Sequence, residues 1–202
     1  MITQKTRLIG GLATTYFSAR GFDVHVDVNV FFDYVKSLIK KTSLIDNMFK
    51  GIVQDRLYIL SDFLVSCADF PDVGRCERRR DRLYEKVWME IDFYLRPYLK
   101  KEFGVIPEVV IDKLSDLDNI LETAISMYLA RGKDSPTDAL FDALKKLGYR
   151  VSDSDNVLDA LYSIVYDWFG RKEQYMRAFV YLLLVVNYAM AFVLVYLEEN
   201  KS

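Results

Sequence analysis

Two polar side chains, Asp27 and Asn29, lie at the end of a segment whose pattern predicts a strand. In residues 23–30, valines alternate with polar residues, which is the period of a β-strand. From Phe31 onward the apolar residues follow helical spacing, which predicts a helix over about 31–53. In open α/β sheets, ligands and metals collect where a strand ends and a helix begins. Asp27 and Asn29 are therefore candidate ligands.

Two further pairs of carboxylates occupy similar predicted positions. Asp134 and Asp138 flank the start of a helix predicted from 136, and Asp153 with Asp155 follows a short predicted strand at 149–151. Carboxylates that converge at one sheet edge repel one another unless a cation bridges them, and oxygen ligands favour Mg²⁺ or Mn²⁺. Such a metal activates water for phosphodiester cleavage. Each aspartate also has a simpler interpretation as a helix cap or turn residue.

The elements that must position these side chains alternate between strand and helix, which predicts a small parallel sheet flanked by many helices. We expect an α/β fold, rich in helix, with an additional long apolar helix at the C-terminus. The expected domains are an N-terminal helical extension (1–21), an α/β domain (22–156) and a C-terminal helical extension (157–202). The expected strands are 23–30, 56–60, 105–112 and 149–151, and the later helices are 75–103, 115–131, 136–147, 157–169 and 173–199.

Composition narrows the function classes. The 202 residues carry a net charge of −2, which argues against nucleic-acid binding by bulk charge alone. The two cysteines, Cys67 and Cys76, and the single His25 do not support a disulfide framework, a zinc site or a catalytic triad. Two free thiols fit a reducing interior, and the N-terminal apolar run is too short for a secretory signal. We therefore expect a cytoplasmic protein.

Three segments in order resemble PIN-domain ribonucleases, a family that includes toxins of toxin–antitoxin pairs. The segments are VDVNVFFDYV, RLYILSDFLVS and TDALFDALKKLGYRVSDSD. The resemblance implies a metal-dependent endoribonuclease that binds Mg²⁺ or Mn²⁺, acts on RNA and has an antitoxin protein as a partner. It assigns the residues as follows: Asp27, Asp138 and Asp155 as catalytic metal ligands, and Asn29, Asp153 and Ser61 in support.

One position departs from the family pattern. The PIN family usually carries a Glu about six residues after the serine, and here that place holds Cys67. The site would then lack one carboxylate, so that it holds metal more weakly or belongs to a catalytically silent relative.

An arginine cluster opens the long charged segment 75–103. Its members are Arg75, Arg78, Arg79, Arg80 and Arg82. One interpretation is a solvated helix face, and the other is a patch that contacts the RNA backbone. Cations at a helix N-terminus oppose the helix dipole, which favours the second interpretation somewhat.

Residues 178–197 contain no charged side chain and are just long enough to span a bilayer. Asn187 lies at the centre of this run, and the tyrosines are spread along it rather than gathered at its ends. We therefore favour a helix buried in the protein or in a homodimer interface over a membrane anchor. Beside the ribonuclease, this leaves two alternative functions: a non-catalytic interaction or assembly protein, and a membrane-anchored protein.

Overall fold

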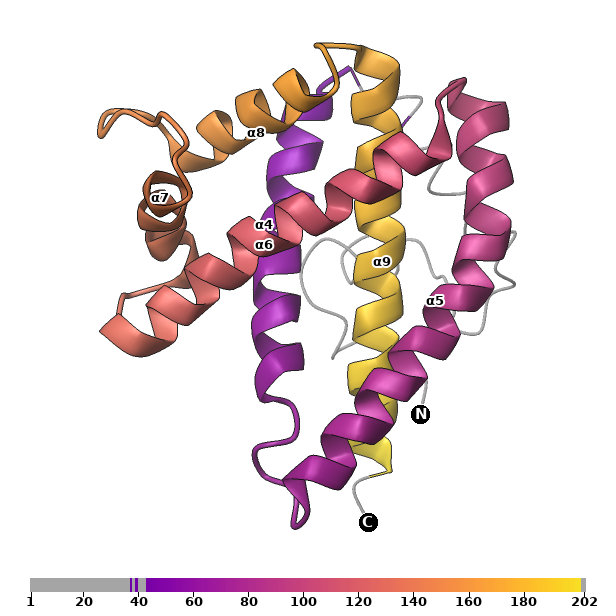
Figure 1. The fold of residues 1–202 in the computed structure, drawn as a ribbon, viewed down its shortest axis with the longest axis vertical. Helices are drawn as coiled ribbons and strands as arrows, with labels where there is room; N and C mark the ends of the chain where they lie inside the picture. The colour runs from indigo at the N-terminus through magenta and orange to yellow at the C-terminus, as the bar shows by residue number, and fades with distance from the viewer. Residues whose placement is uncertain (1–36, 38, 40–42, 201–202) are drawn as a thin grey trace.

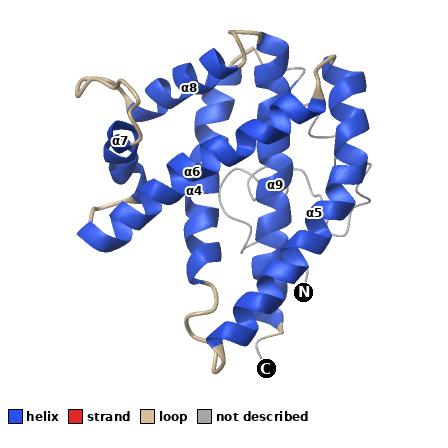
Figure 2. Ribbon diagram, viewed as in Figure 1, coloured by secondary structure: helices blue, strands red, loops and turns tan. Residues whose placement is uncertain are grey.

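The computed structural model describes residues 37, 39 and 43–200, and within them the chain forms helices and no strand (Figure 2). The helices are α4 (Ile45–Val65), α5 (Val73–Phe103), α6 (Pro107–Arg131), α7 (Pro136–Lys146), α8 (Val157–Trp168) and α9 (Glu173–Glu199). The predicted small parallel sheet is therefore wrong for the part of the chain that the structure describes. The predicted strand at 23–30, with Asp27 and Asn29, lies outside the described residues.

The helices surround α9. In Figure 1, α4 and α5 run along opposite sides of α9, and both pack against it. Helix α6 crosses in front of α4 and α9 and contacts both of them, while α7 packs on α6. Helix α8 lies near α4 at the upper end of this view. One continuous hydrophobic core includes buried residues from all six helices.

The predicted strand at 56–60 is the middle of α4. A stripe of buried residues runs through it at helical spacing: Phe49, Ile52, Val53, Arg56, Leu57, Leu60 and Phe63. Arg56 is a charged residue within this otherwise apolar stripe, and yet its side chain is only 1% exposed. Since a short apolar run fits a strand and a buried helix equally well, the sequence did not decide between them. Ser61 and Asp62, which have the side chains of helix caps and suggest a new helix start at this point, lie instead inside α4.

The predicted strand at 105–112 is also wrong, because α6 begins at Pro107. Proline is favoured in the first turn of a helix, where its missing N–H costs nothing. The β-branched residues that suggested a strand belong to a buried helical stripe that continues through Val110, Leu114 and Leu117. The helix predicted to begin at Ser115, with Asp118 three residues later as in a capping box, begins instead at Pro107, so Ser115 lies inside it. Residues 149–151 have neither helical nor strand structure.

Helix ends marked by capping chemistry are confirmed. The hydroxyl oxygen of Ser135 accepts a hydrogen bond from the backbone N–H of Asp138, and Pro136 occupies the first turn of α7. Gly132 ends α6 with a φ of 61°, in the left-handed region that glycine adopts without strain. The predicted helices 157–169 and 173–199 match α8 and α9 within one residue.

Helix α9 supplies the centre of the core. It is long and apolar enough to cross a membrane by length and composition, but most of its apolar stretch is buried inside the protein. All residues from Ala178 to Asn187 are buried. Core helices of soluble proteins are apolar all round for this reason. Of the two interpretations that the sequence favoured, burial in the protein and burial in a homodimer interface, the structure has the first for most of this stretch.

Candidate functional site

The carboxylates predicted to hold a metal are engaged separately in the structure. Asp138 lies exposed in the first turn of α7. Asp153 forms an ion pair with Lys145, and the carboxylate of Asp155 accepts a hydrogen bond of 2.8 Å from the backbone N–H of Ser152. The simpler interpretation, a cap or turn residue, accounts for the contact of Asp155, while Asp138 and Asp153 are exposed at the surface.

No group of three metal-ligating side chains occurs among the described residues. Asp27 and Asn29 lie outside the described residues, and Ser61 is a half-buried residue in the interior of α4. The described carboxylates therefore do not fit a Mg²⁺ or Mn²⁺ site of the kind that the PIN resemblance implies, and we derive no catalytic step from them.

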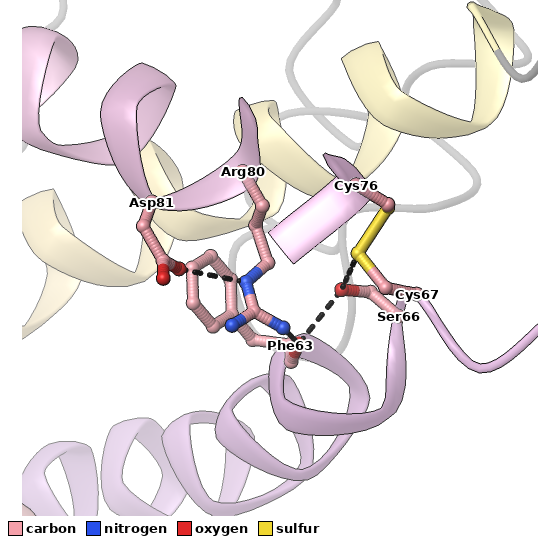
Figure 3. A network of polar contacts seen from close by, with 6 residues as sticks. All are labelled: Phe63, Ser66, Cys67, Cys76, Arg80 and Asp81. Carbon is pink, nitrogen blue, oxygen red and sulfur yellow. Dashed lines mark hydrogen bonds and ion pairs between the residues drawn. A yellow bond between two sulfur atoms is a disulfide. The ribbon is translucent and has the colours of Figure 1, made fainter. Parts of the chain in front are cut away.

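Cys67 and Cys76 form a disulfide, whereas the sequence predicted two free thiols. Both cysteines are buried, and their bond ties the turn after α4 to the first turn of α5 (Figure 3). The nine-residue separation is spanned by the turn after α4 and the first turn of α5, which bring the two Cα atoms to 5.7 Å. Cys67, the position at which the PIN family carries a Glu, thus serves a covalent link between helices.

Arg80 points inward beside this disulfide and is 7% exposed. Its Nη1 donates a 2.9 Å hydrogen bond to the carbonyl oxygen of Phe63, and its guanidinium lies 4.6 Å from the centre of the Phe63 ring. Its Nε donates to Asp81 (Figure 3). Because all of these contacts hold Arg80 within the α4–α5 junction, it is not available to an RNA backbone.

The other arginines of the cluster lie on the outside of α5. Arg75, Arg78, Arg79, Arg82 and Lys86 are exposed and follow one another at i, i+3, i+4, i+7 and i+11. This is the spacing of one helix face. Helix α5 as a whole carries nine Lys and Arg against six Asp and Glu, although the chain as a whole is slightly negative.

None of these five cations has an ion-pair partner among the described residues. Arg79 is nevertheless engaged within the protein, since its guanidinium lies over the Tyr196 ring and donates to the carbonyl oxygen of Asn200. We call the other four, Arg75, Arg78, Arg82 and Lys86, the basic face. Unpaired cations gathered on one helix face form an electrostatic footprint for an anionic partner.

The opposite side of α5 packs on the core, which turns the basic face toward solvent. Ile91, Leu95 and Leu99 are buried there, and α5 packs against α9. At the N-terminus, Asp72 accepts a hydrogen bond from the backbone N–H of Arg75 and so begins the helix. Together with the disulfide and Arg80, these contacts hold the basic face toward solvent on a rigid element.

A second polar group, which the sequence did not predict, lies inside the core. The Nε and Nη2 atoms of Arg56 donate to the two carboxylate oxygens of Asp118 at 2.7 Å each, and its Nη1 donates to Asn187 at 3.0 Å. Asn187 in turn donates to the carbonyl oxygen of Ile52. Two features of the sequence could have indicated this buried polar group: Arg56 stands in an apolar stripe, and Asn187 stands in the middle of an uncharged run.

Electrostatics keep the Arg56 group charged. Burial opposes the charge of Arg56, but the charge and hydrogen bonds of Asp118 offset this, so the pKa of Arg56 lies above its ordinary value. Burial also raises the pKa of Tyr84, which adjoins Arg56. Every polar atom of the Arg56 guanidinium has a partner in α6 or α9, which fits a structural role: the group joins α4, α6 and α9 at one point.

Neither protein-family models, nor curated protein sequences, nor solved structures give a match to this chain. The resemblance to PIN-domain ribonucleases therefore has no support beyond the residues that carry it, and the fold that it implies is wrong for the described residues.

Proposed function

We propose that this protein is a non-enzymatic binding protein and that the basic face of α5 binds the phosphate backbone of nucleic acid. RNA is the ligand used in the test below. The observation that carries the proposal is the row of exposed, unpaired cations Arg75, Arg78, Arg82 and Lys86. Arginine and lysine that neutralise phosphates release counterions and supply most of the sequence-independent affinity for nucleic acid. The net charge of −2 makes this local face, rather than bulk charge, the source of attraction.

The positions of the predicted metal ligands favour a binding function without catalysis over the ribonuclease. Asp138, Asp153 and Asp155 have separate surroundings and form no metal-binding group with other described residues. The ribonuclease, its Mg²⁺ or Mn²⁺ cofactor and an antitoxin partner stay predictions of the PIN resemblance, as does the homodimer suggested by the apolar C-terminal run.

The test measures the affinity of the full chain for a labelled RNA oligonucleotide across a series of salt concentrations. The variant Arg78→Gln/Arg82→Gln removes two cations from the basic face. The control Lys146→Gln/Arg150→Gln removes two exposed cations from the region of α7, so the net charge changes equally. For a single strand, each lost phosphate contact lowers the salt slope by about 0.7, so we expect a decrease of roughly 1.4 for the first variant and almost none for the control.

The integrity of the RNA is followed in the same mixtures with Mn²⁺ added. Intact RNA is the expected result. Cleavage that disappears in the Asp27→Asn variant would establish the ribonuclease instead. Equal salt slopes in the wild type and both variants would overturn binding by the basic face.

A further inference from the structure

Three large apolar side chains stand exposed on α5 just beyond the basic face. Met89 is 65% exposed, Phe93 is 76% exposed and Tyr94 is 43% exposed. The rings of Phe93 and Tyr94 meet edge to face at 5.3 Å. Phe93 is thus the most exposed large hydrophobic residue of the described chain, on a helix whose other side supplies the core.

The exposed rings continue the line of cations. Counted from Arg75, Met89 is at i+14 and Phe93 at i+18, so both fall on the same helix face as the basic face. With a rise of 1.5 Å per residue, Phe93 lies roughly 10 Å beyond Lys86 along the helix axis. One extended ligand of moderate length therefore reaches the cations and the ring together.

A hollow follows at the end of α5. It has a volume of about 480 Å³ and lies between the last turns of α5 and the start of α6. Its lining combines the apolar groups Pro97, Ile106 and Pro107 with the cations of Arg96 and Lys100 and the carboxylate of Glu108, which pairs with Arg96. A hollow of this size with apolar groups in its lining suits a flat apolar ring.

We infer that the outer face of α5 binds single-stranded nucleic acid, with bases stacked on Phe93 and in the adjoining hollow while phosphates lie on the basic face. The inference rests on the proposed function and deepens it. Proteins that bind single strands combine a positively charged track with aromatic platforms for successive bases. In a duplex the bases are already stacked on one another, so Phe93 adds nothing to duplex binding.

Two other occupants fit this face less well. A second copy related by a two-fold axis would place the same surface opposite itself, so two copies of α5, each with nine Lys and Arg against six Asp and Glu, would face and repel each other. A flat anionic bilayer would lie across the whole face and meet the carboxylates of Glu85 and Glu90, which are exposed on either side of the line from Lys86 to Phe93. A narrow single strand follows that line between them. A single strand brings phosphates and bases in alternation, as the cations and rings require.

The experiment compares the affinity of the full chain for a 12-nucleotide uridine oligomer with its affinity for an RNA duplex of equal length. Phe93→Ala removes the platform, Phe93→Leu keeps an apolar side chain without a ring, and Phe93→Tyr keeps the ring. Because stacking contributes a large share per base, Phe93→Ala is expected to weaken single-strand binding by roughly 5- to 100-fold, with duplex binding unchanged. Phe93→Leu should lose most of the same affinity and Phe93→Tyr should retain it. Since the side chain is exposed, all variants are expected to keep the thermal unfolding midpoint of the wild type.

The outcomes separate the inference from the proposed function. If the arginine variants weaken binding but Phe93→Ala affects single strand and duplex equally, base stacking is overturned and phosphate binding stands. If Phe93→Leu binds the single strand as tightly as the wild type, the ring has no role and stacking is again overturned. If the wild type binds neither RNA but Phe93→Ala abolishes its pelleting with phosphatidylserine vesicles, the face is a lipid surface and both proposals fall.

Discussion

Arg56 is a fully buried cation, and its ion pair with Asp118 makes the helix junction vulnerable to single substitutions. Asp118→Ala removes the carboxylate that pairs with the guanidinium and leaves it in the core beside the neutral side chains of Asn187 and Tyr84. Removing one partner of a buried pair costs about 3–5 kcal/mol. We expect the free energy of unfolding, measured with urea, to fall by at least about 3 kcal/mol.

The matched control is Asp112→Ala, an exposed aspartate on the same helix α6. Its effect should stay within about 0.5 kcal/mol. The double variant Arg56→Met/Asp118→Leu should recover much of the loss, because apolar replacement of a buried pair is often neutral. A loss below about 1 kcal/mol in Asp118→Ala would contradict a structural role for this pair.

Glu122 gives a pH dependence with a definite sign. Burial, and then the charge of Asp118, raise the pKa of Glu122 from its ordinary 4.5, and Arg56 acts in the opposite direction. The native state then binds more protons than the unfolded state as pH rises from about 4.5 to the folded pKa, so stability falls across that window. Glu122→Gln should therefore unfold like the wild type at pH 4 and be more stable than the wild type at pH 7.

Urea midpoints measured from pH 4 to pH 8 check this, with Asp112→Asn as the control on α6. A stability difference between Glu122→Gln and the wild type that is the same at every pH would show that proton binding by Glu122 is not its cause.

Of the predicted site residues, Asp155 has the turn role that the simpler interpretation gave it, since its carboxylate accepts from the backbone N–H of Ser152. Asp138 lies in the first turn of α7 but is not the cap, because its backbone N–H donates to Ser135. Whether they converge depends on a sheet that the described chain lacks. Of the five arginines, only Arg80 turns inward, and the sequence carries no sign of this because its partner is the carbonyl oxygen of Phe63.

At the level of elements, the α4–α5 junction depends on the Cys67–Cys76 disulfide. Closing a loop of this length stabilises a protein by roughly 2–3 kcal/mol, chiefly by restricting the unfolded chain. For a chain of this size, we expect a reductant to lower the thermal unfolding midpoint by about 5–10 °C. Cys67→Ala/Cys76→Ala should unfold near the reduced wild type and should not respond to reductant. A midpoint of the wild type that reductant leaves unchanged would contradict a stabilising disulfide.

The helices of the C-terminal half could be predicted because residues next to each helix end determine where that helix begins or stops. Ser135, Pro136 and Gly132 act within one turn of the chain, so neighbours in sequence suffice to place them. The segments at 56–60 and 105–112 were mistaken for strands because their burial comes from partners far away in sequence. Arg56 looks like a break in an apolar helix until Asp118, sixty-two residues later, is known to pair with it.

For the whole molecule, the decisive question is what α9 does in solution. The uncharged run 178–197 serves a soluble core, a dimer interface or a membrane span equally well by composition, but in the structure its residues pack against α4, α5 and α6 of the same chain. A chain ending at Lys172 would expose the apolar faces of all three helices and leave Arg56 without Asn187. We therefore expect the truncated chain to lose its cooperative thermal transition and to aggregate.

The measurement compares full-length and truncated protein by circular dichroism on heating and by light scattering after size exclusion. As a control, a chain ending at Leu197 removes only the final turn beyond the core residues of α9, and it should unfold cooperatively. The full chain should appear in the soluble fraction without detergent. A truncated chain that stays soluble and unfolds cooperatively would mean that α4, α5 and α6 have a core without α9. The apolar helix α9 would then be available to a partner or a bilayer. The packing of α5 against α9 would not be needed to hold the basic face in place.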